Sequence, residues 1–101
     1  MVLNQVTLVG NIVRDFELRE TPNGDPVCNL EIILDNKKTP KKTFVSLTVW
    51  DELAQHIFKL CKKGSKIFVF GRLSNDSFFD RETNKEFSKL IVTVEDFVLL
   101  K

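Results

Sequence analysis

The stretch from Phe44 to Leu73 constrains the fold most, because three regular elements follow one another there. Residues 44–50 alternate between apolar side chains and a mixed set, which predicts a half-buried strand. We expect the apolar set to face the core and the mixed set, with two aromatic rings among hydroxyl side chains, to face solvent. The inward set is Val45, Leu47 and Val49, and the outward set is Phe44, Ser46, Thr48 and Trp50.

A helix and a second strand complete this stretch. Asp51 is a good N-cap residue, and the apolar residues after it recur at helical spacing. We expect the helix to carry Lys59, Lys62 and Lys63 in its last turn, where cations suit the helix dipole, and to end at Gly64. In the strand that follows, we expect Ile67, Val69 and Leu73 to face the core and Lys66, Phe68, Phe70 and Arg72 to face outward.

The rest of the chain is dominated by strand patterns and turns. Gly10 predicts a bulge or sharp bend in the first strand, which we expect to continue with altered register through 14–18. Thr21–Gly24 is a strong turn signal, and 35–42 is a polar loop. The remaining predicted elements are strands over 3–13, 27–34 and 89–100, and a hairpin over 74–87 with its tip at 81–84.

The element order β-β-β-α-β-β predicts an all-β fold, a five-stranded OB-fold barrel. The helix lies between strands three and four, and the hairpin is an extension between strands four and five. The bend at Gly10 lets one long first strand serve both halves of a closed barrel. A split β-α-β fold is less favoured, because only one helix is available. The length suits a single domain over 1–101.

The composition argues against several classes of protein but does not identify a binding partner. The net charge of +1 carries almost no information about partners, and no apolar run approaches the length of a membrane span. The N-terminus lacks the basic region of a secretory signal. Cys28 and Cys61 sit in apolar patterns, which favours two buried free thiols over a disulfide or half of a metal site. With His56 as the single histidine, expected at the surface, we predict no enzyme, no catalytic residue, no metal and no cofactor.

The chain resembles bacterial-type single-stranded DNA-binding proteins in several sequence motifs. The most specific match is KKGSKIFVFGRL, residues 62–73. The other matching words are VTLVGNIVRDFELRETPNG (6–24), the Val-Cys-Asn of the second strand (27–29) and FVSLTVWDELA (44–54), in the same order and spacing. The resemblance implies an OB-fold, a homo-oligomer without enzymatic activity, and sequence-tolerant binding of single strands.

The family binds through aromatic rings on which bases stack and through basic residues along the groove. The positions here that match the aromatic sites are Phe44, Trp50 and Phe78, and the first two already lie on the outward face of the predicted strand. Each also has a structural alternative, in the core or in an oligomer contact. The basic residues expected along the same path are Arg19, Lys37, Lys38, Lys41, Lys42, Lys66 and Arg72, although a lysine run by itself favours a solvated loop.

The sequence also departs from the family pattern. Ser74–Ser77 places an acid and neutral residues where cations are usual, Phe16 replaces a proline, and Glu20 replaces an aromatic residue. The loop at 35–42 is short and lacks its aromatic residue. The chain stops at Lys101, without the acidic, hydrophobic C-terminal tail that recruits partners, so we expect either a shortened chain or a naturally short form.

Two hypotheses therefore remain. The first is binding of single-stranded DNA, or RNA, without sequence specificity, protecting single strands in replication, recombination or repair, in the cytoplasm with the nucleoid or in an organelle stroma or matrix. The second is a specialised short relative, of primosomal or organellar type, that mainly docks proteins and binds nucleic acid weakly. In both, we expect a homodimer or homotetramer with Phe68 and Phe70 at the interface, or else on the DNA surface. Replication proteins are the further partners, and no membrane is involved.

Overall fold

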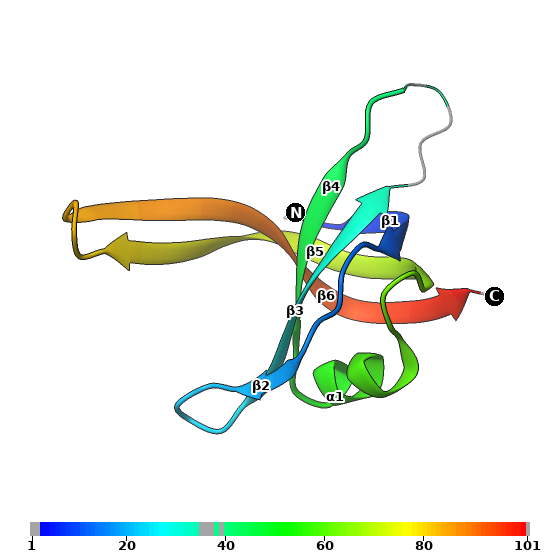
Figure 1. Ribbon diagram of the computed structural model, residues 1–101, viewed down its shortest axis with the longest axis horizontal. Helices are drawn as coiled ribbons and strands as arrows, with labels where there is room; N and C mark the ends of the chain where they lie inside the picture. The colour runs from blue at the N-terminus through cyan, green and yellow to red at the C-terminus, as the bar shows by residue number, and fades with distance from the viewer. Residues whose placement is uncertain (1–2, 35–37, 39, 101) are drawn as a thin grey trace.

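Six strands and one helix form the part of the protein that a computed structural model describes, which is residues 3–34, 38 and 40–100 without the side chain of Phe78 (Figure 1). The one helix in these ranges is too short and too polar to span a membrane. The elements are β1 (Val6–Ile12), β2 (Leu18–Glu20), β3 (Pro26–Leu34), β4 (Phe44–Trp50), α1 (Asp51–Leu60), β5 (Lys66–Asp80) and β6 (Lys85–Leu100).

The strands close into a barrel because β1 pairs with two others. Its residues Val6–Asn11 pair with β5, and Gly10–Ile12 also pair with β3. The sheet order β1-β5-β6-β4-β3 is thereby joined into a ring, with β4 and β6 parallel, and β2 is added outside β3. The five ring strands are β1, β3, β4, β5 and β6, and α1 connects the third to the fourth of them. The predicted OB-fold barrel is confirmed.

Gly10 is the junction at which this ring closes. It is opposite Leu34 of β3 and Ile67 of β5 at the same time, and it is buried. A methyl group at this position would overlap the backbone oxygen of Ile33. The predicted bend at Gly10 is therefore a close approach of three strands that leaves no room for a side chain.

The core follows the predicted strand faces. Leu47 and Val49 of β4 are buried, whereas Phe44 and Trp50 on its other face are exposed. Ala54 and Ile57 attach α1 to the end of the barrel near β2, as Figure 1 shows. The remaining core residues come from every ring strand: Ile12, Cys28, Leu30, Ile32, Ile67, Val69, Val92 and Val94, with Cys61.

Both cysteines are buried free thiols, as expected. The Cys28 thiol donates a hydrogen bond to the carbonyl oxygen of Ala54 at 3.5 Å, which ties β3 to α1. Burial raises the pKa of Cys28 to about 11, partly offset by the charge of Arg19, and burial also raises the pKa of Cys61. Both thiols are therefore protonated at neutral pH and serve as small apolar side chains.

The predicted helix ends were wrong. Trp50, still extended at the end of β4, occupies the N-cap position without a side-chain cap hydrogen bond, and Asp51 has φ 60° where the chain turns into α1. At the other end, Cys61 is already extended because its side chain enters the core, so α1 stops at Leu60. Gly64, with φ 91°, instead lies in the turn after the helix. Its backbone N–H donates to the carbonyl oxygen of Ile12 at 2.8 Å.

Two strand predictions also need correction. Residues 14–18 do not continue β1, because the chain bends at Arg14 and Phe16 packs against Phe58 of α1. Leu73 was expected in the core and is 44% exposed. The register of β5 against β6 shifts at Phe70/Gly71, and beyond this point β5 leaves the barrel.

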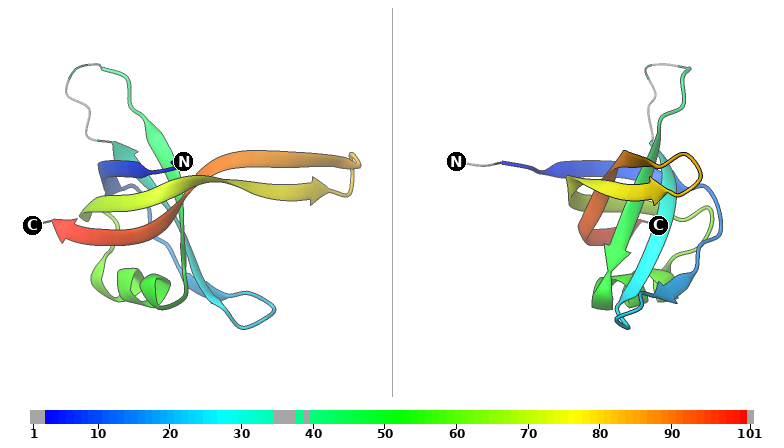
Figure 2. Two further views of the ribbon diagram at one scale, coloured as in Figure 1. Left: turned by 180° about the vertical axis from the view of Figure 1, so that it is seen from behind. Right: turned by 90° about the vertical axis from the view of Figure 1, so that its left-hand side faces the viewer.

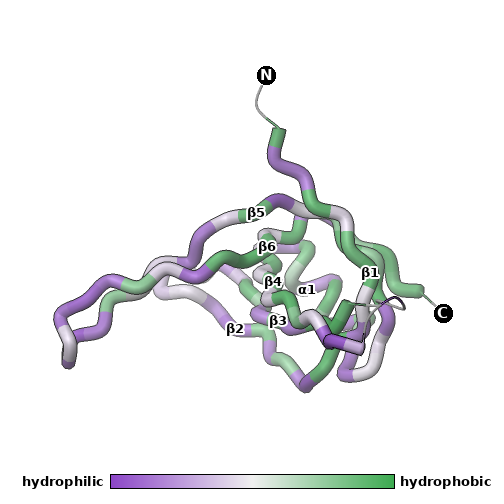
Figure 3. The backbone as a smooth tube through the Cα atoms, turned by 90° about the horizontal axis from the view of Figure 1, so that it is seen from above, coloured by the Kyte–Doolittle hydropathy of each residue, from purple (hydrophilic) through white to green (hydrophobic). Residues whose placement is uncertain are grey.

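The predicted hairpin is part of a long arm. β5 and β6 pair continuously out to Asp80 and Lys85, with turn residues at 81–84 as predicted. The arm projects from the barrel in Figure 1 and in the left-hand view of Figure 2, and it points toward the viewer in the right-hand view of Figure 2. Hydrophilic and hydrophobic residues are mixed along its length (Figure 3).

The Gly10 junction can be tested by adding one methyl group. Gly10→Ala should lower the free energy of unfolding by about 1–3 kcal/mol, because the new methyl overlaps backbone that cannot move without breaking the ring. The measurement is urea unfolding followed by circular dichroism. Gly24→Asn is the control, since Gly24 has open space around it and Asn tolerates its φ of 87°. Equal stability of wild type and Gly10→Ala would contradict the role of this junction.

Candidate nucleic-acid interface

A groove runs along β4 beneath the root of the arm, beside β3 at its Trp50 end and in its middle, and toward β1 at its Phe44 end. It consists of three connected cavities of about 290, 320 and 330 Å³, here called the Trp50 end, the central compartment and the Phe44 end. Asn29, Thr48, Asp76 and Ile91 line both the Trp50 end and the central compartment. Ser46, Lys89 and Ile91 line both the central compartment and the Phe44 end.

The Trp50 end is a row of side chains across three strands. Arg19 of β2 pairs with Val27 of β3, which pairs with Trp50 of β4. Residues in register point to the same face, so the long side chains of Arg19 and Trp50 flank Val27, which is buried although it faces outward. The indole of Trp50 is 42% exposed. This end therefore presents a flat aromatic ring beside a guanidinium group.

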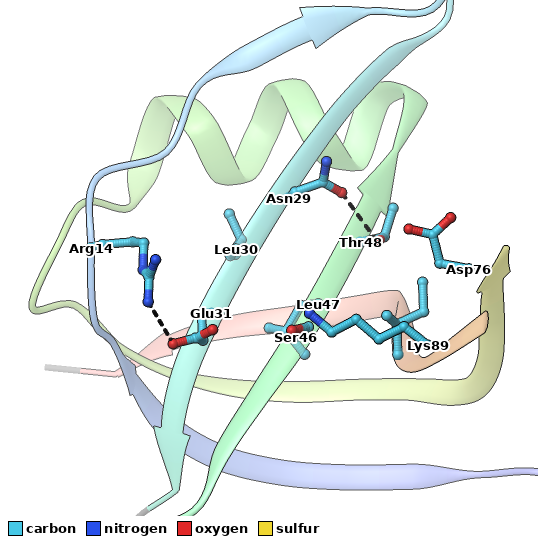
Figure 4. Close-up of a pocket in the computed structure, with 10 residues that line it drawn as sticks. Arg14, Asn29, Leu30, Glu31, Ser46, Leu47, Thr48, Asp76 and Lys89 are labelled. Atoms are coloured by element: carbon cyan, nitrogen blue, oxygen red, sulfur yellow. Dashed lines mark hydrogen bonds and ion pairs between the residues drawn. The ribbon is translucent and has the colours of Figure 1, made fainter. Parts of the chain in front are cut away.

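The central compartment is polar and electrically balanced (Figure 4). Arg14 Nη2 donates to Glu31 Oε1 at 2.9 Å, and Asp76 is opposite Lys89 in the register of the arm. Two positive and two negative groups thus line the same space. Because they cancel, this part of the groove attracts phosphate much less than a row of lysines would.

An amide and a hydroxyl also line the central compartment. Thr48, which is largely buried, donates from Oγ1 to Asn29 Oδ1 at 3.2 Å. This bond fixes the amide of Asn29 in the groove, as Figure 4 shows. The nitrogen of that amide carries two N–H donors, which suit the carbonyl and ring-nitrogen acceptors of nucleobases.

The Phe44 end is apolar at its mouth and basic at its rim. The ring of Phe44 is 53% exposed, and Leu73 and Leu90 of the arm are exposed beside it. The exposed Lys41 and Lys42 lie just before β4 in the loop that leads to Phe44. An aromatic ring and nearby cations thus recur at this end, as at the other.

The predicted site residues fall into three groups. Phe44, Trp50 and Arg19 line the groove. Lys66 and Arg72, on the outward side of β5, line none of its three cavities. The others lie in the β3–β4 loop or on the arm: Lys38, Lys41 and Lys42 are exposed in the loop, Lys37 lies outside the described residues, and Phe78 is opposite Phe87 on the arm, with its side chain outside the described part.

Several groove residues were missed from the sequence. Asn29 alternates with the buried Cys28 and Leu30 in the second strand, but its polarity alone did not mark it as part of a site. Arg14 and Lys89 reach the groove through a bend and through the curvature of the arm, which no local pattern reveals. The departure noted at Ser74–Ser77 does bear on the groove, because Ser74, Asn75 and Asp76 line its Trp50 end.

Comparison with known proteins identifies the family of the chain. Residues 3–100 match the model of the single-strand binding protein family. A single-stranded DNA-binding protein of Thermus thermophilus is 39% identical over 88 residues, which is 84% of this chain and 33% of the relative. One of Deinococcus radiodurans is 33% identical over 90 residues, 82% of this chain and 30% of the relative.

The length of the relatives differs from one to another. The chain spans about a third of the two relatives just described. A single-stranded DNA-binding protein 1 of Nostoc sp. strain PCC 7120 is 33% identical over 101 residues, which is 99% of this chain and 85% of the relative. Since the family model and these relatives all match over most of the sequence, the chain belongs to the single-strand binding protein family.

Proposed function

We propose that the protein binds single-stranded DNA along the groove, with little preference for base sequence and without a catalytic step. The observation that carries this proposal is the pair of exposed aromatic rings, Phe44 and Trp50, at the two ends of one groove. The names of the relatives support it. The cellular role that follows is protection of single strands in replication, recombination and repair, at the nucleoid.

Stacking explains why the binding is tolerant of sequence. Every base has a π-face, so an exposed ring binds any base and contributes about 1–3 kcal/mol for each base stacked. Phe44 and Trp50 are six residues apart on β4, which is about 20 Å at the rise of a strand. A single strand therefore has to run the length of the groove to use both rings, and duplex DNA cannot offer its bases in this way.

Because of how the charges are distributed, we expect base stacking to contribute more to the binding free energy than phosphate contacts do. Cations lie at the ends of the groove, in Arg19 and in Lys41 and Lys42, whereas the central compartment is balanced. Phosphate contacts release counterions and make affinity dependent on salt. With few cations in the middle of the groove, we propose binding that is weaker than in more basic relatives and less sensitive to salt.

Fluorescence of Trp50 tests the path, since Trp50 is the only tryptophan and the chain has no tyrosine. Saturating oligothymidylate should quench its emission, and a duplex of equal length should quench it much less. Trp50→Ala should lower the affinity by about 1–3 kcal/mol, and Trp50→Phe should retain most of it. Emission that stays unchanged at saturation would remove Trp50 from the binding surface.

A charge reversal tests the balance of forces. Asp76→Arg should tighten binding and steepen the dependence of log K on log salt by about 0.7, the value for one added phosphate contact on a single strand. Glu86→Arg makes the same charge change on the other face of the arm and is the control. If the two variants have equal slopes, the face of the arm that carries Asp76 is not on the DNA path. A protein-docking role would then be favoured.

We further propose that two or four copies of the chain associate through the outer face of β1, β5 and β6. Phe68 and Phe70 lie side by side there, with ring centroids 4.8 Å apart, and Val98, paired with Phe68, is 48% exposed. In the described pairings, Val6–Val9 has β5 on one side and no strand on the other. An apolar face beside an open strand edge favours association with a second copy.

This association can be tested by light scattering at micromolar concentration. The wild type should have the mass of a dimer or tetramer, and Phe68→Ser with Phe70→Ser should give a soluble monomer, because the double change removes the apolar contact. Leu60→Ser, which alters another exposed apolar side chain, should leave the mass unchanged. A monomeric wild type would contradict the proposal and return Phe68 and Phe70 to the candidate DNA surface.

A further inference from the structure

An aromatic and basic surface lies outside the groove, between α1 and the segment that follows β1. Its centre is a cavity of about 170 Å³, and we call it the Phe58 surface. The rings of Phe16 and Phe58 meet edge to face, with centroids 6.0 Å apart and planes at 79°. The residues that line the cavity are Asp15, Phe16, Phe58, Cys61, Lys62 and Lys63.

The two rings have different surroundings. Phe16 is half-buried and packs against the core, so its role is structural. Phe58 is 45% exposed although it is large and apolar. Packing against the edge of Phe16 restricts the orientations of the Phe58 ring. The result is a supported aromatic ring with part of its surface in solvent, which is the arrangement that base stacking requires.

The lysines beside this ring are held on a fixed turn. The backbone N–H of Lys62 donates to Ser65 Oγ at 3.0 Å, and Asn11 Nδ2 and the Gly64 N–H tie the same turn to β1. Lys62 and Lys63 are exposed and make no ion pair with another described residue. One carboxylate, that of Asp15, also lines the cavity, so the cavity carries two positive charges against one negative charge.

The Phe58 surface is continuous in sequence with the groove. Arg14 lines the central compartment, and Asp15 and Phe16 directly after it line the cavity at Phe58. Figure 4 shows Arg14 at the margin of the groove, on the segment that leads away toward α1. A strand that leaves the central compartment past Arg14 therefore comes next to Phe58.

We propose that the Phe58 surface is a second contact for single-stranded nucleic acid. Phe58 stacks one base, and Lys62 and Lys63 contact the neighbouring phosphates of a strand that has left the groove past Arg14. The balanced central compartment allows this exit, because it does not hold the phosphates in place. The inference rests on the proposed binding of single strands in the groove and adds a surface that only a longer strand can reach.

The test compares two lengths of oligothymidylate. The short probe is the shortest one that gives full quenching of Trp50, and the long probe is four times that length. Phe58→Ala should weaken binding of the long probe about five-fold or more, the loss expected for one stacked base, and leave the short probe unchanged. Phe58→Tyr should restore binding of the long probe. Leu60→Ala is the matched control, since Leu60 is 47% exposed on the same helix and does not line the cavity.

The lysines give a second test that does not depend on the packing of Phe58. Lys62→Gln with Lys63→Gln should lower the salt slope of the long probe by about 1.4, or 0.7 for each of two phosphate contacts. The slope of the short probe should not change. Lys62→Arg with Lys63→Arg keeps both charges and should retain the slope.

The outcomes separate this inference from the proposed function. If the wild type binds neither probe, the proposed function fails and takes the inference with it. If the wild type binds both and the Phe58 and lysine variants leave the ratio of long to short affinity unchanged, only the inference fails. Equal weakening of both probes would also overturn it, because the variants would then act on the groove or on the fold.

Discussion

The structure depends on one close approach of backbone to backbone at Gly10. Gly10 of β1 pairs with Leu34 of β3 and with Ile67 of β5, and the space between these strands leaves no room for a side chain at Gly10. This junction closes the ring of strands. Because the ring is closed, β3 and β4 keep a fixed curvature, which places Phe44 and Trp50 at opposite ends of one outer face. The proposed binding surface is therefore a consequence of how the barrel closes.

Along that surface, aromatic rings and charges are used separately. Aromatic rings with nearby cations lie at the two ends of the groove. The middle contains equal numbers of positive and negative side chains and an amide fixed by a hydroxyl. In the proposed function, the single strand is therefore held mainly through the flat faces of its bases rather than through its charge. The same combination of a supported ring and lysines recurs at Phe58, on the far side of Arg14.

Sequence patterns predicted those features that depend on a single strand. Alternation placed Leu47 and Val49 in the core and Trp50 outside, because each face of a half-buried strand has its own composition. Features set by contacts between distant segments were not predicted. The end of α1 depends on Cys61 entering the core, Leu73 is exposed because β5 continues beyond the barrel as the arm, and Lys89 reaches the groove only through the arm. Local residue types carry no signal for such contacts.

The position of β6 has a consequence for how the molecule forms. It is the last strand in the sequence, yet in the sheet it lies between β5 and β4 and joins the two halves of the ring. Until β6 has been synthesised, β4 and β5 have no common neighbour in the sheet, and their apolar faces lack cover. Closure of the barrel therefore follows the synthesis of β6. Its rate is governed by the search for pairings between distant segments, not by the formation of α1.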